Sequence, residues 1–165
     1  MIFNKTKHNP DLYNTLLLLS RNIFFYKELK LEDTYETRIY LMFFHYSIIL
    51  SISKTKGNEP DQENYNSLFF YIENNLREMG FGDVSVNKKM KDLNKIFYDI
   101  LVKFKKNSNN FEISKTLSTK YFENLKNNLK NWENFSKYFS NFYSFCFELD
   151  SKSVIKDAKN FILRF

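Results

Sequence analysis

The chain has 165 residues, of which 43% are hydrophobic and 27% charged, a balance that excludes an intrinsically disordered chain and allows a sizeable core. Its net charge of +6 would suit phosphate, anionic lipid or an acidic protein, but no block of five or six like charges occurs. A solvated surface dotted with lysines is therefore the simpler interpretation of the charge.

Two helices are expected in the first third of the chain. Asn9 can cap the first helix and Pro10 can occupy its first turn. The apolar residues that follow recur every three or four positions, at Leu12, Leu16, Leu19, Ile23 and Tyr26. Asp33 or Thr34 can cap a second helix that runs to about Lys54. This helix is apolar on most sides, which predicts a central position, and its most apolar stretch of about 14 residues is shorter than the roughly 20 that a membrane span needs.

Glycines and a proline divide the middle of the chain. Gly57 is placed to end the second helix and Pro60 to begin the third, which Gly80 should end in the left-handed conformation that glycine adopts most easily. The apolar positions of the third helix are Tyr65, Leu68, Ile72, Leu76 and Met79. Ser85 is expected to cap a fourth helix, whose buried stripe is Val86, Met90, Leu93, Phe97, Ile100 and Phe104. Its outer face carries charges of both signs, at Lys88, Lys91, Asp92, Lys95 and Asp99.

The last third of the chain also has helical spacing. A polar loop is expected at residues 105–112. From Leu117 to Cys146 the apolar residues keep a helical period, but so long a helix is unusual in a small domain, and a break is expected at residues 126–131. A last short helix ends in "NFILRF", and no segment alternates as a strand does. The prediction is an all-α, single-domain helical bundle of about six helices over residues 1–165. Its core should include Ile39, Phe43, Phe44, Ile48, Met90, Leu93, Phe97 and Leu101.

Residues with catalytic or metal-binding chemistry are few. The sequence has no phosphate-binding glycine loop, nucleophile elbow or paired-histidine metal motif, and His8 and His45 lie far apart. Cys146 stands at helical spacing from Phe139 and Phe142, which favours a core thiol over a nucleophile. His45 could be a proton relay or a haem ligand, but a core histidine bonded to a backbone carbonyl or a tyrosine is the favoured interpretation. Neither an enzyme nor a bound cofactor is expected.

Two segments carry a longer signature. "LREMGFGDVSVNKKMKDLNKIFYD", residues 76–99, holds two of the three glycines within three positions, and "FFYKELKLEDTYETRIYLMFFHYSIIL", residues 24–50, joins an aromatic turn to a capped helix with Arg38 and His45. Both resemble the ubiquinol–cytochrome c chaperone family, in which a helix ending in Leu-Arg-Glu-Met-Gly is followed by Gly-Asp and a helix with two lysines and an aromatic pair. Arg38 and His45 also fall on positions of that pattern. In the first segment the matching residues are Leu76, Arg77, Glu78, Met79, Gly80, Gly82, Asp83, Val86, Lys88, Lys89, Met90, Phe97 and Tyr98.

The resemblance implies a helical, non-catalytic assembly chaperone for the ubiquinol–cytochrome c reductase complex (complex III). Its implied partners are newly made cytochrome b, a second assembly factor and the membrane surface. Because only about nine residues precede the first helix, a bacterial protein is expected, cytoplasmic and peripheral to the inner membrane; a processed mitochondrial form would lie on the matrix side. The alternative is a peripheral protein that binds anionic lipid, or a helical scaffold, without a respiratory client. No specific nucleic acid is expected, because most aromatics of the fourth helix fall on its buried stripe, where they cannot stack on bases.

The corner between the third and fourth helices is the candidate functional site. Its turn is formed by Met79, Gly80, Gly82 and Asp83, for which a structural role is favoured, and Asp83 can bind free amides at the start of the fourth helix. An acidic loop of the client, or lipid headgroups, could dock on the cations around it, which are Arg77, Lys88, Lys89 and Lys91. Lys88, Lys91 and Lys95 should point away from the core, whereas the stem of Lys89 should lie along apolar surface.

Overall fold

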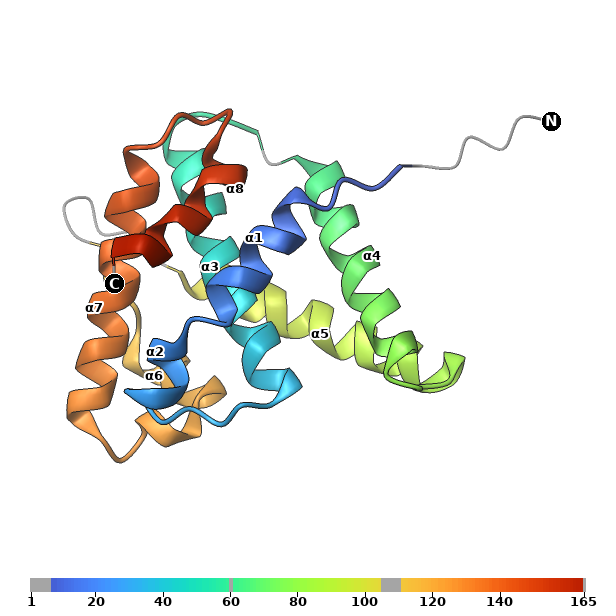
Figure 1. Cartoon of the computed structure of the whole chain (residues 1–165), viewed down its shortest axis with the longest axis horizontal. Helices are drawn as coiled ribbons and strands as arrows, with labels where there is room; N and C mark the ends of the chain where they lie inside the picture. Colours follow the sequence, from blue (N-terminus) through green and yellow to red (C-terminus); the bar gives the residue numbers. More distant parts are fainter. Residues whose placement is uncertain (1–6, 60, 105–110, 165) are drawn as a thin grey trace.

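Helices make up all the regular structure in the residues that the computed structural model describes, which are 7–59, 61–104 and 111–164. In chain order they are α1 (Asp11–Ser20), α2 (Ile23–Lys27), α3 (Tyr35–Thr55), α4 (Gln62–Glu78), α5 (Asp83–Lys103), α6 (Lys115–Tyr121), the 3-10 helix η1 (Glu123–Leu125), α7 (Leu129–Phe147), α8 (Val154–Asp157) and the 3-10 helix η2 (Ala158–Arg164). Figure 1 shows their arrangement. The all-α prediction is confirmed, and the estimate of about six helices is close, because the additional segments are short.

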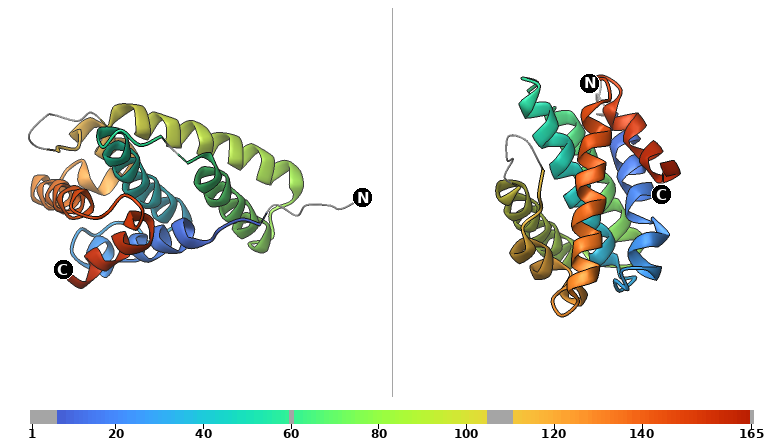
Figure 2. Two further views of the ribbon diagram at one scale, coloured as in Figure 1. Left: turned by 90° about the horizontal axis from the view of Figure 1, so that it is seen from above. Right: turned by 90° about the vertical axis from the view of Figure 1, so that its left-hand side faces the viewer.

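The long helix α3 lies at the centre of the fold and packs against α1, α5 and α7 (Figures 1 and 2). The hydroxyl of Thr34 caps it by accepting a hydrogen bond from the amide of Thr37 at 3.1 Å. Residues 41–49 are all buried, because neighbouring helices cover α3 on several sides. Its apolar residues therefore surround the helix and do not form a single stripe. This confirms the prediction of a central helix that is apolar on most sides. No helix in the described part of the chain is long and apolar enough to cross a membrane.

The first predicted helix is divided in two at Arg21 and Asn22. The side chain of Asn22 caps α2 by accepting a hydrogen bond from the amide of Phe24 at 3.1 Å. The bend takes Ile23 out of line with the apolar stripe of α1, and this side chain is 57% exposed. Its predicted place on that stripe is therefore wrong. Phe25 is the residue of α2 that is buried in the core.

The predicted start of α1 differs in detail from the structure, whereas the predicted end of α3 is confirmed. Asn9 accepts a hydrogen bond from the amide of Asp11, but Pro10 stands at the N-cap itself and not in the first turn. Gly57 follows the end of α3 with a positive φ of 76°, as its predicted role as a terminator requires. Pro60, the predicted start of the next helix, lies outside the described residues.

Helices α4 and α5 form a hairpin on one side of α3, and the far face of α5 is open to solvent (Figure 2). The core prediction is confirmed for six of its eight members, which are buried: Ile39, Phe43, Phe44, Ile48, Leu93 and Phe97. The other two members, Met90 and Leu101, are partly buried and pack against this core, at the edge of the stripe centred on Phe97. Met79 is also not on the buried face of α4, since it follows the last turn and is 51% exposed.

The C-terminal half wraps around the opposite side of α3. The predicted break within residues 117–146 is confirmed but begins earlier, because α6 ends at Tyr121 and α7 begins only at Leu129. Asp99 of α5 ties α6 in place through Lys120, at 2.8 Å, and through the hydroxyl of Tyr121. Hydrogen bonds from these groups and from Lys103 hold the pKa of Asp99 well below its usual range. Most of the loop expected at residues 105–112 lies outside the described part of the chain.

Candidate functional site

Backbone hydrogen bonds close the turn after α4 in a conformation that favours glycine. The amide of Gly80 donates to the carbonyl of Arg77 at 3.0 Å, and the amide of Phe81 donates to that of Leu76 at 3.3 Å. These two bonds form a Schellman motif, in which the residue after the C-cap has a positive φ; that of Gly80 is 93°. The predicted left-handed glycine is confirmed. Phe81 and Leu76, which hold the two positions that are usually apolar in this motif, line the same groove.

The helix after the turn begins three residues earlier than predicted. Its N-cap is Gly82 and not Ser85, and the amide of Val86 donates to the carbonyl of Gly82 at 2.9 Å. Asp83 stands in the first turn, where a carboxylate interacts favourably with the helix dipole. No side chain caps this N-terminus, so the expectation that Asp83 binds its free amides is wrong. The carboxylate of Asp83 bonds Arg77 instead.

Arg77 joins the two helices of the corner and is not a free cation. Its guanidinium pairs with Asp83 and, at 3.4 Å, with Glu73 one turn earlier on α4. Asp83, and to a lesser extent Glu73, raise the pKa of Arg77 further above its usual range. Two carboxylates thus balance this positive charge. Arg77 holds the geometry of the corner and adds little attraction for an acidic partner.

Lys89 covers an apolar groove beside the corner, as the prediction for its stem required. Its ammonium group lies 4.6 Å from the centre of the Phe81 ring and its side chain is partly buried. The groove has a volume of about 230 Å³ and is bounded by α3, the end of α4 and the start of α5. Its apolar lining is Tyr35, Tyr40, Leu76, Met79, Phe81, Leu93 and Ile96, and its charged lining is Glu36, Lys89 and Asp92. Such a groove fits an apolar side chain better than an anion.

Lys88 and Lys91 face away from this groove. Both are exposed, on the outer side of α5, and neither forms an ion pair with any residue that the structure describes. The four predicted cations therefore stand in three different surroundings: Arg77 is paired, Lys89 covers the groove, and Lys88 and Lys91 are solvated.

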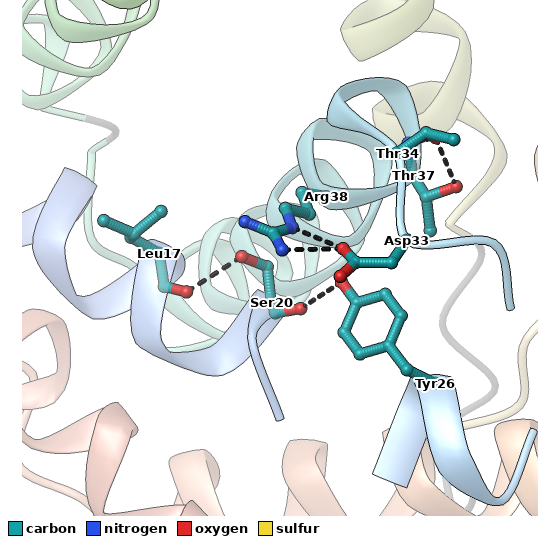
Figure 3. Close-up of polar contacts among 7 residues, drawn as sticks. All are labelled: Leu17, Ser20, Tyr26, Asp33, Thr34, Thr37 and Arg38. Atoms are coloured by element: carbon teal, nitrogen blue, oxygen red, sulfur yellow. Dashed lines mark hydrogen bonds and ion pairs between the residues drawn. The ribbon is translucent and has the colours of Figure 1, made fainter. Parts of the chain in front are cut away.

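Arg38 fastens the loop between α2 and α3. Figure 3 shows its guanidinium against Asp33, with nitrogen–oxygen distances of 2.7 and 2.8 Å, next to the hydrogen bond that Tyr26 donates to the carbonyl of Ser20 at 2.6 Å. Burial raises the pKa of Tyr26 to about 12, and the charge of Arg38 opposes this. The contacts join the end of α1 and α2 to the start of α3. They give Arg38 a structural role.

His45 is a core residue, as favoured from the sequence. Its Nδ1 lies 2.6 Å from the carbonyl oxygen of Leu41 and its Nε2 lies 2.9 Å from the hydroxyl of Tyr138 on α7. A carbonyl can only accept, so Nδ1 carries the proton and Nε2 accepts from Tyr138. The rings of Phe139 and Phe142 pack at 4.8 Å between centroids. Both nitrogens are occupied, which argues against a haem ligand at this position.

The described residues offer no cluster of side chains that could hold a metal ion. They contain no group of three potential ligands among His, Cys, Asp and Glu. Cys146 is buried, and burial raises the pKa of its thiol, which disfavours the reactive thiolate. The surface around α5, with a groove and solvated cations, is suited to contact with another molecule.

These features are those of an all-helical protein with an apolar groove beside a charged corner between two helices. A family model described as "Ubiquinol-cytochrome C chaperone" matches residues 27–138, well over half of the chain. The chain belongs to this family, and a role in the assembly of complex III follows from that membership. No curated protein and no solved structure matches the chain. The matched region contains Arg38, His45 and the whole corner, and it ends at Tyr138, the partner of His45.

One feature of the site had a weak signal in the sequence and another had none. Phe81, between the two glycines, stands where a Schellman motif usually places an apolar residue, so the motif could have identified it as part of the groove. Nothing in the sequence could have paired Tyr138 with His45, because 93 residues separate them.

Proposed function

We propose that this protein binds newly made cytochrome b and holds it during the biogenesis of complex III. Family membership supports the assembly role. The observation that carries the proposal of a client site is the groove at the α4–α5 corner, where an apolar floor is covered by one movable lysine.

A newly made membrane subunit exposes apolar side chains before its partner subunits cover them. The groove offers such a side chain the surfaces of Leu76 and Leu93, which are buried from solvent below it. Lys89 can swing aside at small cost, since a cation over an exposed aromatic ring contributes only about 0.5–1 kcal/mol. Met79 stands at the rim, 51% exposed, where it can adapt to different partners.

The surrounding charges can orient the client. Lys89, Glu36 and Asp92 line the groove, so a client segment with both signs of charge would fit better than a purely acidic one. We place the protein on the cytoplasmic face of a bacterial inner membrane, or on the matrix side in a mitochondrion, as a peripheral protein that can work with a second assembly factor.

The test is recovery of cytochrome b with the tagged protein from membranes in mild detergent. Met79→Glu should reduce that recovery, because a carboxylate at the rim disfavours an apolar occupant. The matched control is Leu163→Glu, which places the same charge on η2, at a side chain that is 85% exposed. Recovery of no respiratory subunit by the unaltered protein would contradict the proposal. Deletion of the gene should lower the b-type haem signal in difference spectra.

The alternative function is binding of anionic lipid without a protein client. The solvated Lys88 and Lys91 favour it, because unpaired cations attract lipid phosphates. Flotation with vesicles separates the two functions. Binding to anionic vesicles, together with no recovery of cytochrome b, would support the lipid-binding alternative.

A further inference from the structure

A narrow stripe of exposed residues runs along the whole outer face of α5. Its members follow one another at alternating intervals of four and three residues: Val84, Lys88, Lys91, Lys95, Tyr98 and Val102. At 100° per residue they fall within a sector about 80° wide, and at 1.5 Å per residue the stripe is about 27 Å long. We call this set the α5 seam. All six side chains are exposed, and at the C-terminal end of the seam Tyr98 lies beside Tyr65 of α4, with 6.4 Å between the ring centroids.

The seam has an uncommon composition for an exposed face of a helix. Val84, Tyr98 and Val102 are 87%, 54% and 75% exposed. The three lysines between them are exposed too, and they form no ion pair within the part of the chain that the structure describes. A seam with apolar ends and an unbalanced positive centre is complementary to a partner with apolar ends and an acidic centre.

We propose that the α5 seam binds an acidic amphipathic α-helix of another protein, laid along α5. Alternation of four- and three-residue intervals is the spacing by which one helix follows another, as in a coiled coil. Three carboxylates on the partner would face Lys88, Lys91 and Lys95, and its apolar residues would cover Val84 at one end and Tyr98 and Val102 at the other.

The C-terminal end of the seam continues into a second groove, of about 760 Å³, between α3, α5, residues 57–59 and the start of α4. Tyr98 and Val102 line both the seam and this groove, and Tyr46, Leu50 and Tyr65 form its apolar walls. An apolar side chain at the end of the partner helix can therefore be anchored there. The seam and the groove together provide charge along the helix and an apolar anchor at its end.

A membrane surface fits the seam less well than a helix. Helices that lie in a bilayer present a broad apolar face with cations along its flanks, whereas here the lysines occupy the centre of a narrow stripe. Asp92 and Asp99 lie beside the seam; Lys103 and Lys120 balance the charge of Asp99, whereas the exposed Asp92 would repel the phosphates of a flat anionic surface. A single helix can pass between such neighbours.

A second copy of this chain is also a poor occupant. In an antiparallel pair of identical seams Lys91 would lie opposite Lys95, and in a parallel pair each lysine would lie opposite itself. Like charges at these distances repel, so self-association through the seam is disfavoured. The proposal is independent of the client groove, since Lys89 and Phe81 lie on a different side of α5.

The probe is a pair of designed 21-residue helical peptides, labelled with fluorescein. On the face that would contact α5, both peptides carry leucine at the two ends. At the three central positions of that face one peptide carries glutamate and the other carries lysine. Fluorescence anisotropy with the full-length protein at low salt should give a Kd about tenfold lower for the glutamate peptide, because each exposed ion pair changes Kd about two- to threefold. Added salt should remove the difference. Equal affinity for both peptides would overturn the proposal.

Variants locate the binding. Simultaneous Lys88→Glu, Lys91→Glu and Lys95→Glu substitution should reverse the preference in favour of the lysine peptide. Circular dichroism should show unchanged helicity, because these side chains are solvated.

The matched control has the same change in net charge on elements away from α5. It substitutes glutamate for three other exposed lysines, Lys126, Lys130 and Lys159. This variant should keep the preference for the glutamate peptide. Loss of that preference would show that the net charge of the protein, and not the seam, determines which peptide binds more tightly.

Vesicles of phosphatidylcholine and phosphatidylglycerol provide the membrane comparison. One outcome is that the native protein binds both peptides equally and floats with the vesicles, whereas the triple glutamate variant of the seam does not float. In that case the seam would be a lipid contact and the proposal would be wrong. Another outcome is that the native protein prefers the glutamate peptide, while cells with the triple glutamate variant of the seam keep a normal level of complex III. This result would support the proposed helix contact and separate it from complex III assembly.

Discussion

The buried His45 should make the protein less stable in mild acid, by an amount that the structure allows us to state. Burial lowers the pKa of His45 to about 3, opposed in part by its hydrogen bond with the carbonyl of Leu41. In the unfolded chain the pKa is about 6.5. Below pH 6.5 the unfolded chain therefore binds a proton that the folded chain does not bind. The stability due to neutral His45 is fully present above pH 6.5 and is lost as the pH falls towards 3.

The size of the effect follows from proton linkage. Between pH 7 and pH 5 the unfolded chain takes up about 0.7 of a proton at this site while the folded chain takes up almost none, which lowers the free energy of unfolding by about 2 kcal/mol. This figure depends little on the folded pKa, provided that it lies well below 5. The hydrogen bond with Tyr138 favours the same neutral form, because protonated Nε2 could no longer accept from that hydroxyl.

The variant that isolates the effect is His45→Phe, since a phenyl ring suits the aromatic surroundings but cannot be protonated. At pH 7 it should be less stable than the native protein by about 1–3 kcal/mol, the usual cost of losing buried hydrogen bonds. At pH 5 that difference should shrink by about 2 kcal/mol, because only the native protein loses the contribution of His45.

Urea unfolding followed by circular dichroism at pH 7 and pH 5 measures both quantities. His8→Gln, which removes the other histidine, is the control and should keep the pH dependence of the native protein. If His45→Phe loses as much stability between pH 7 and pH 5 as the native protein does, then His45 is not the residue responsible and the reasoning is refuted.

Three further predictions concern the corner and the core. Gly80→Ala should destabilise by about 1 kcal/mol in urea unfolding, because a Cβ is disfavoured at positive φ even though it would meet nothing within 4 Å; an unchanged midpoint would contradict this. Phe97→Ala should lower the free energy of unfolding by about 3–5 kcal/mol, because it leaves a cavity in the core. Tyr98→Ala, at the exposed neighbouring position, should lower it by only about 0.5 kcal/mol. Similar losses in the two variants would show that the buried stripe of α5 is misassigned. Combined Lys88→Glu and Lys89→Glu substitution should leave helicity and melting nearly unchanged but lower the amount of assembled complex III in cells, and a native level of the complex would mean that these lysines are only solvated.

Local features of the fold could be predicted well from sequence. The helical period of apolar residues identified α3, α4 and α5, and the cap of α3 at Thr34 and the terminator Gly80 were both found where expected. A helix period, a cap and a positive φ depend on residues within a few positions of one another. The same locality explains the errors: Ser85 has the side chain of a good cap, but the Schellman motif after α4 brings the chain back into helix already at Asp83.

The chemistry of the site was decided by tertiary structure. Sequence grouped Arg77 and Lys89 as similar cations, but the turn brings Asp83 against Arg77 and places Phe81 beneath Lys89. The bond between His45 and Tyr138 likewise joins helices that are distant in sequence. Such contacts depend on how each helix is rotated about its axis and how it crosses its neighbours. Those rotations are set by the packing of all the buried side chains together, and no local pattern of residues contains them.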